Sequence, residues 1–199
     1  MDFAELSRRL EALLRGEGGK PPLGPARLEH SLGVAALAAE LCLRRGLDPE
    51  RGRAAGLAHD LCKELPREAQ RALASTRAGA SPSSARLVDK AVHGPAAAAL
   101  LERDFGVDDE ELLDAVSCHT FGRPDMGLLA TLLYCADKLE PGRRRVDPAF
   151  RERCLGLPPG EMLREVAENL VGRLASDGLP IAPETARLLE SLKGRVPTP

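Results

Sequence analysis

The chain has 199 residues, of which 43% are hydrophobic and 29% charged, so it can bury the core of one globular domain. Its formal net charge of -2 excludes the strong positive field of a typical nucleic-acid-binding protein, and an aromatic content of 3% argues against a stacking surface for single strands. Apolar runs all fall short of the ~20 residues that a membrane helix needs. We therefore expect neither a nucleic-acid partner nor a membrane.

The cysteine pattern indicates a reducing compartment. The count is odd, no Cys-x-x-Cys pair occurs, and several of the cysteines lie within helical patterns, which is typical of buried free thiols. We recognise no signal peptide, so we expect a cytoplasmic protein. The five cysteines are Cys42, Cys62, Cys118, Cys135 and Cys154.

Apolar residues recur every three or four positions along most of the chain, which predicts helices. Proline and glycine punctuate these stretches, and Asp108 and Asp125 are acceptor residues that we expect to cap two of the helices. The segment 75–84 is expected to be a surface loop. The predicted helices cover 3–15, 25–45, 49–63, 84–93, 96–104, two stretches that begin near Asp108 and Asp125, 160–176 and 183–193.

We find no alternating strand pattern, internal repeat or linker. The sequence therefore predicts an all-α fold and one domain over residues 1–199, closed by C-terminal helices within 159–194.

The most informative stretch runs from Gly56 to Lys63, where His59 directly precedes Asp60 in a small, apolar context. Burying an imidazole and a carboxylate costs several kcal/mol unless they are paired, and a metal ion is the natural partner of such a pair. All four histidines of the chain lie in or beside apolar helical patterns, and an aspartate joins them inside another apolar run. The predicted ligands are His30, His59, Asp60, His93, His119 and Asp137.

A single histidine on an apolar helix face is more often a core residue than a ligand. That reading weakens for the whole set, because all four histidines share such positions and two acids accompany them. Six nitrogen and oxygen ligands without a thiolate suit iron, manganese or cobalt better than structural zinc. Two such ions can generate a nucleophile from water at neutral pH and clamp the attacking and leaving oxygens.

The order of these residues resembles the H…HD…D signature of the HD phosphohydrolase superfamily, in which a helical bundle surrounds the metal. More narrowly, it resembles the YqeK-like HD proteins, a family of symmetrical diadenosine tetraphosphate hydrolases. The His-Thr-x-Gly-Arg and Asp-x-x-Glu-Pro-Gly-Arg motifs are more specific than the signature itself. The matching stretches, within 27–143, are Arg27–Val34, Gly56–Lys63, His93–Pro95, Cys118–Pro124 and Ala136–Arg143.

The resemblance implies a site for two iron ions and symmetrical cleavage of diadenosine tetraphosphate to two ADP. One ion would bind His30, His59, Asp60 and Asp137, and the other would bind Asp60, His93 and His119, with Asp60 bridging. The sequence leaves the oligomeric state open, a homodimer included. Two departures from the family pattern are Phe121 for a threonine and Glu64 for an aspartate.

A polyphosphate substrate also requires cations that are not metal ligands. Lys63 follows His59 by four positions, so a helix would place it beside the ligands. Arg123 and Arg143 lie just past the helices that carry predicted metal ligands. From there a guanidinium can donate two parallel hydrogen bonds to phosphate oxygens. We expect Arg144 and Arg145 to be solvated.

The catalytic residues are therefore expected to be Asp60, Lys63 and Arg123. The expected substrate-binding residues are Arg27, Lys63, Thr120, Arg123 and Arg143. Two alternatives remain open: an HD phosphohydrolase acting on a mononucleotide or a guanosine polyphosphate, and a nucleotide-sensing module without turnover. Loss of a metal ligand would favour the sensing module, but none of the six is missing.

Overall fold

The structure is a computed structural model that describes residues 1–17, 23–77 and 91–193, and within these ranges its regular elements are all helices. The all-α prediction is confirmed. None of the described helices combines the length and apolar character needed to cross a bilayer. The described helices are α1 (Phe3–Leu14), α2 (Pro25–Arg44), α3 (Pro49–Ala58), α4 (Arg67–Ala74), α6 (His93–Phe105), α7 (Glu110–Cys118), α8 (Leu128–Leu139), α9 (Pro148–Leu155), α10 (Pro159–Ser176) and α11 (Pro183–Lys193).

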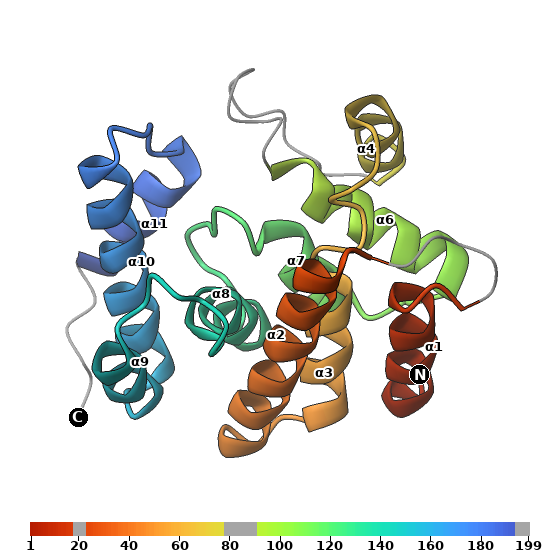
Figure 1. Ribbon diagram of the computed structural model, residues 1–199, viewed down its shortest axis with the longest axis horizontal. Coiled ribbons are helices and arrows are strands. Elements are labelled where there is room, and N and C mark those ends of the chain that lie inside the picture. The colour runs from red at the N-terminus through yellow and green to blue at the C-terminus, as the bar shows by residue number, and fades with distance from the viewer. Residues whose placement is uncertain (18–22, 78–90, 194–199) are drawn as a thin grey trace.

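Helices α2 and α3 lie side by side at the centre of the molecule (Figure 1). Helix α1 packs against α3, and α6 packs against α7 and α4. Helix α8 contacts α2 on one side and α10 on the other, while α9 and α11 pack against α10. Helix α8 therefore joins the central helices to the C-terminal ones.

One hydrophobic cluster extends from Leu6 in α1 to Leu192 in α11 and consists mainly of leucine and alanine. Tyr134 in α8 is fully buried within it. The cluster includes residues of both the N-terminal and the C-terminal helices, and the single domain over residues 1–199 stays a prediction.

Two glycines allow α2 and α3 to approach closely. A Cβ atom on Gly56 would lie 2.5 Å from the Ala35 Cα, and one on Gly52 would lie 2.7 Å from the Ala38 carbonyl oxygen. Any larger residue at either position would force the two helices apart. This close packing matters for the site, because α2 supplies His30 and the end of α3 supplies His59.

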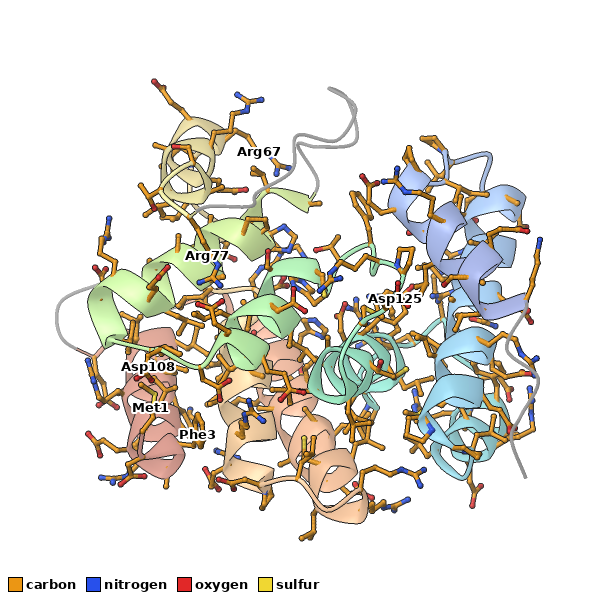
Figure 2. All side chains as sticks on the ribbon, turned by 180° about the vertical axis from the view of Figure 1, so that it is seen from behind. Met1, Phe3, Arg67, Arg77, Asp108 and Asp125 are labelled. Carbon is orange, nitrogen blue, oxygen red and sulfur yellow. The ribbon has the colours of Figure 1, made fainter. Side chains whose placement is uncertain are left out.

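Four predicted helix boundaries are corrected. The helix predicted over 96–104 begins at His93, because Gly94 and Pro95 lie within its first turn. Helix α3 ends at Ala58, before the predicted Lys63. Helix α7 is capped by Asp109, not Asp108, since the Asp109 Oδ1 accepts hydrogen bonds from two amides of the first turn. Asp125 does not cap α8, which begins at Leu128; it lies in the preceding turn with φ 58° (Figure 2).

Helices α4 and α9 were not expected from the sequence. Each has eight residues, and together they bury only Gln70, Ala74 and Cys154, so they lack the apolar periodicity of a longer helix. The predicted helix 84–93 and loop 75–84 fall largely outside the described residues.

Candidate metal centre

The chain turns tightly just after α3, and this turn positions the histidine–aspartate pair. The His59 amide still bonds to the Ala55 carbonyl, but the Leu61 and Lys63 amides bond to carbonyls only three residues earlier. These shorter steps form successive tight turns in place of a continuing α-helix. Asp60 therefore lies fully buried at the end of α3 while Lys63 remains partly exposed.

The first ligand group combines residues from α2, the end of α3 and α8. His30 Nε2 lies 3.2 Å from His59 Nε2 and 3.2 Å from Asp137 Oδ1. His59 Nε2 lies 3.6 Å from Asp60 Oδ2 and 3.8 Å from Asp137 Oδ1. The structure thus brings together the four residues predicted for one ion.

The second ligand group adjoins the first and shares Asp60 with it. Asp60 Oδ1 lies 3.1 Å from His93 Nε2 and 3.6 Å from His119 Nε2, and these two nitrogens are 3.2 Å apart. One Asp60 oxygen therefore faces each group, which is the arrangement of a bridging carboxylate. All three residues are buried.

The histidines direct bare nitrogen atoms at these two groups. The Nδ1 atoms of His59 and His119 donate to the carbonyls of Gly56 and Val116, at 2.7 and 2.8 Å, and His30 Nδ1 donates to Glu140 at 3.1 Å. A neutral imidazole that donates through Nδ1 has an unprotonated Nε2.

The unprotonated Nε2 of His59 then faces His30 Nε2 and oxygens of Asp60 and Asp137, and such a set of donors fits a metal ion. Burial lowers the pKa of His30, but hydrogen bonds to Asp137 and Glu140 outweigh it and raise that pKa, so a proton and a metal ion would compete for the His30 Nε2.

The protonation states agree with ligand chemistry. Burial lowers the pKa of His59 to about 3 and also lowers the pKa of His93, so both rings are neutral at pH 7. Burial opposes ionisation of Asp60, but the adjacent histidines outweigh it and hold the Asp60 pKa far below its usual range. For Asp137, Lys138 and His30 overcome the same burial penalty. Both carboxylates are therefore ionised and able to bind metal.

Several cations border the ligand groups. Lys63 Nζ lies 2.9 and 3.1 Å from the two Asp60 oxygens, and Arg27 Nη1 lies 2.9 Å from Oδ2. Arg143 pairs with Asp137 and lies 3.2 Å from His30 Nε2. The structure thus places three predicted substrate-binding residues, Arg27, Lys63 and Arg143, at the metal ligands.

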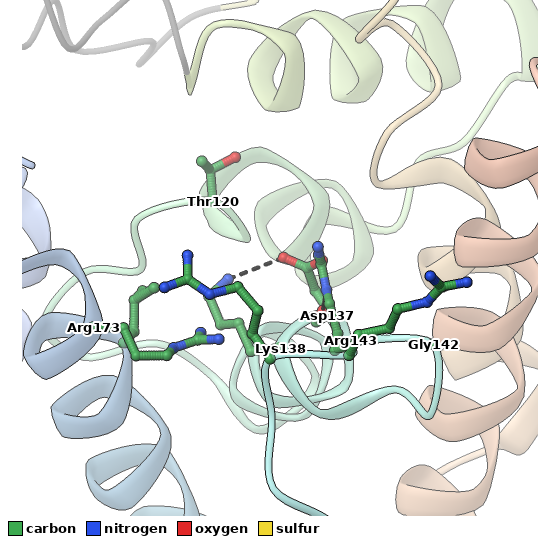
Figure 3. A pocket seen from close by; sticks show the side chains of 9 residues that line it. Thr120, Asp137, Lys138, Gly142, Arg143 and Arg173 are labelled. Atoms are coloured by element: carbon green, nitrogen blue, oxygen red, sulfur yellow. Dashed lines mark hydrogen bonds and ion pairs between the residues drawn. The ribbon is translucent and has the colours of Figure 1, made fainter. Parts of the chain in front are cut away.

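A pocket of about 430 Å³ opens beside Asp137, and its wall is strongly cationic (Figure 3). It includes Thr120, whose hydroxyl lies 3.2 Å from His119 Nε2 and 3.3 Å from His93 Nε2. The pocket therefore reaches from one ligand group toward the other. Its lining residues are Thr120, Asp137, Lys138, Gly142, Arg143, Arg144, Arg145, Leu170 and Arg173.

Arg123 differs from the other predicted substrate-binding residues, because within the described structure it neither pairs with a metal ligand nor lines this pocket. Its guanidinium lies 2.8 Å from both oxygens of Asp114, and its side chain is 45% exposed. The expectation that Arg144 and Arg145 are exposed is met, but both also line the pocket.

Three contributors were missed from the sequence: Lys138, Glu140 and Arg173. Lys138 is buried, lies 3.0 Å from Asp137 Oδ2 and donates to the His119 carbonyl at 2.9 Å. Glu140 orients His30. The motif Asp137–Arg143 contained the signal for the first two, whereas nothing local to Arg173 marked it.

An all-helical bundle that gathers buried histidines and aspartates into two adjoining groups defines a class of metal-dependent hydrolases. Residues 27–142, more than half of the chain, match the family model described as "HD domain". The chain belongs to the HD domain family, as its motifs predicted.

Named relatives make the comparison more specific. The chain is 37% identical over 169 residues to a Bacillus subtilis protein named "Bis(5'-nucleosyl)-tetraphosphatase, symmetrical", covering 83% of this chain and 89% of that protein. A Staphylococcus aureus protein of the same name is 36% identical over 126 residues, covering 62% of this chain and 63% of that protein.

A solved structure agrees with the fold. It is described as a predicted HD superfamily hydrolase involved in NAD metabolism from Clostridium acetobutylicum, and it superimposes with a TM-score of 0.79 at 28% identity. The match covers 95% of this chain and 97% of that one, so the C-terminal helices belong to the shared fold.

Proposed function

We propose that this chain is a metal-dependent hydrolase that cleaves diadenosine tetraphosphate symmetrically into two ADP. One observation carries the proposal: the two ligand groups that share Asp60 adjoin a pocket that Asp137 and Thr120 border and whose wall is rich in lysine and arginine. A tetraphosphate bridge brings several negative charges, and such a wall can bind them. The names of the relatives point to the same substrate class.

Two divalent ions, when bound, would supply an activated water and a clamp on the phosphate oxygens. His30, His59, Asp60 and Asp137 would hold one ion, and Asp60, His93 and His119 the other. The remaining chemistry belongs to the chain. Lys63 and Arg27 donate to the Asp60 carboxylate and hold it in place, and Arg143 can turn its planar donors toward a phosphate oxygen beside His30.

Symmetrical cleavage requires that the bond between an inner phosphorus atom and the central bridging oxygen breaks. Water adds its oxygen to one of the two inner phosphorus atoms, and the central bridging oxygen leaves with the other half of the substrate. Both halves then carry two phosphates, so both products are ADP. Lys138, Arg143 and Thr120 lie where they can donate to the phosphates on either side of this bond.

Iron is the metal that we propose, with manganese or cobalt as substitutes, since the predicted ligands are nitrogen and oxygen atoms. A reducing cytoplasm is the proposed compartment, and the five free cysteines, of which four are buried, support it. A homodimer stays a prediction.

The test is turnover of a nucleotide panel by the metal-loaded chain, with products separated by chromatography. We expect ADP as the sole product from diadenosine tetraphosphate, and slower turnover of mononucleotides and guanosine polyphosphates. ATP with AMP would contradict symmetrical cleavage. Tight binding of a nucleotide without turnover would instead favour the sensing module.

A further inference from the structure

One wall of the cationic pocket comes from the C-terminal helix α10, which contributes Leu170 and Arg173. Helix α10 packs against α8, which carries Asp137 and Lys138. In Figure 3 Arg173 extends from α10 toward the space that Lys138 and Asp137 border from the other side. The pocket therefore lies between two helices that are far apart in the sequence.

Positive charges outnumber negative charges on the wall of this pocket. Five cationic residues line the pocket with a single carboxylate, Asp137, which already pairs with Lys138 and Arg143. Arg145 pairs with Asp177 at 2.8 and 2.9 Å. Within the described part of the chain, we find no carboxylate that forms an ion pair with Arg173 or Arg144.

Arg173 also has an unsatisfied donor. Its Nε is buried, and no acceptor for it occurs among the described residues. A buried N–H without a partner costs ~1–3 kcal/mol. Burial and the nearby charges of Arg145 and Arg143 lower the pKa of Arg173, so its environment disfavours the positive charge. A bound anion would both accept the Nε hydrogen bond and relieve the repulsion.

We propose that Arg173, together with Arg144 of the same pocket wall, forms a second phosphate subsite that binds the half of the substrate farther from the metal ligands. This inference rests on the proposed function for the identity of the substrate. It gives α10 a role in binding the phosphate chain as well as in packing against α8. The subsite would favour long phosphate chains over a single phosphate, since a long chain can contact the Asp137 side of the pocket and α10 at the same time.

A purely structural role for Arg173 is the competing explanation. Arginine often covers apolar surface with its stem, and Leu170 lies one turn earlier on the same face of α10. A buried Nε without an acceptor does not by itself mark a binding site, since Arg45 has one outside the pocket, but Arg173 combines it with a place in the cationic pocket wall.

The experiment compares Arg173→Gln with Arg164→Gln in the full, metal-loaded chain. Arg164 lies on the same helix about two and a half turns earlier at ~3.6 residues per turn, so it faces away from Arg173. It is absent from the pocket wall. Two quantities are measured: steady-state kinetics with diadenosine tetraphosphate, and equilibrium binding of inorganic tripolyphosphate.

For Arg173→Gln we expect roughly tenfold to hundredfold weaker tripolyphosphate binding, the range for a lost charge-assisted hydrogen bond. The KM for diadenosine tetraphosphate should rise more than kcat falls, because the contact is remote from the bond that breaks. Arg173→Lys should restore part of the affinity through its charge. Arg164→Gln should match the wild type.

Unchanged tripolyphosphate binding in Arg173→Gln, with melting temperature preserved, would overturn the subsite. An equal loss in Arg164→Gln would also overturn it, since the effect would then be general. The proposed function fails separately. If the wild type does not cleave diadenosine tetraphosphate but still loses tripolyphosphate affinity on Arg173→Gln, the subsite stands and the substrate assignment does not.

Discussion

At the scale of single residues, Asp60 has the most connected position in the site. One of its oxygens faces His59 and the other faces His93 and His119. Lys63 also contacts both oxygens. The loss of this carboxylate would therefore affect both ligand groups at once, whereas each histidine belongs to only one.

Asp60→Ala should lose both metal ions and all hydrolysis, while His93→Ala should lose mainly the second ion. The reason is that Asp60 bridges the two groups and His93 contacts only one of its oxygens. Elemental analysis of the purified variants measures the metal content, and far-UV circular dichroism checks that the helices remain. Equal loss of both ions in the two variants would show that the ligands are divided differently.

Arg143 and Arg123 provide a second contrast. Arg143→Ala should reduce kcat by about a hundredfold or more, the cost of removing a donor that strengthens in the transition state. Arg123→Ala should cost less, because Arg123 pairs with Asp114 outside the pocket. Steady-state kinetics tests both variants, with metal content measured in each because Arg143 also contacts Asp137.

From the sequence alone we expected Arg123→Ala to lower kcat, since Arg123 follows the His119 turn. A large loss of kcat in Arg123→Ala, together with a nearly unchanged kcat in Arg143→Ala, would support that expectation. The substrate would then bind on the Arg123 side of Thr120.

At the scale of elements, the site depends on how closely α3 packs against α2. Gly56 both permits this approach and accepts the His59 Nδ1 hydrogen bond through its carbonyl. The same residue therefore controls a helix–helix contact and the orientation of a metal ligand.

Gly56→Ala should destabilise the protein by about 1–3 kcal/mol, the usual cost of overpacking a core. The added Cβ would meet Ala35 backbone atoms, which cannot move independently of α2. Urea unfolding measures the change. Gly172→Ala is the matched control, because Gly172 also lies within a helix but has open space around it, so it should gain about 0.5–1 kcal/mol. Similar changes of sign and size in both variants would contradict the packing argument.

An ion pair connects two other elements. Arg51 of α3 donates to both oxygens of Asp109 at 2.6 and 2.5 Å, and Asp109 caps α7, which ends at the His119 turn. Burial raises the pKa of Asp109, but the hydrogen bonds from Arg51 and from the helix amides outweigh burial, so the pKa is lowered.

Asp109→Asn should be about 1.5–3 kcal/mol less stable at pH 7, because asparagine keeps the cap but loses the charge. A lowered carboxyl pKa contributes stability that is present above the unfolded value of ~3.9 and is lost as pH falls through the folded value. The difference between wild type and variant should therefore shrink as pH drops below ~4. Thermal unfolding from neutral to acidic pH tests this. A difference independent of pH would mean that charge is not the cause.

At the scale of the whole molecule, the helices that proline and glycine delimit were predictable from the sequence. Helix α11 matches the prediction, and α10 and α2 differ by one residue at one end. All six predicted metal ligands also meet, because the apolar pattern already placed them on inward faces.

Contacts between distant segments were not predictable in this way. Arg173 reaches the pocket only because α10 packs against α8. Arg123 is adjacent to the His119 turn in sequence, but Gly122 adopts φ 66°, and Arg123 pairs with Asp114. Neither outcome follows from local periodicity.

The metal ions should matter for stability of the whole molecule without being required for its helices. Bare nitrogen atoms and two carboxylates meet in the buried site, whereas the leucine and alanine core forms independently of them. A chelator should therefore lower the melting temperature but leave the far-UV circular dichroism near its native value at 25 °C.

The expected size follows from mass action. A ligand at a hundred times its Kd adds about 2.7 kcal/mol, and each kcal/mol shifts the melting temperature of a chain this long by about 2–4 °C. Readdition of ferrous or manganous ion should restore both the original melting temperature and the hydrolase activity. Elemental analysis should give close to two ions per chain before chelation. A single zinc ion with full activity would contradict the dinuclear site, and complete unfolding on chelation would show that the core depends on the metal.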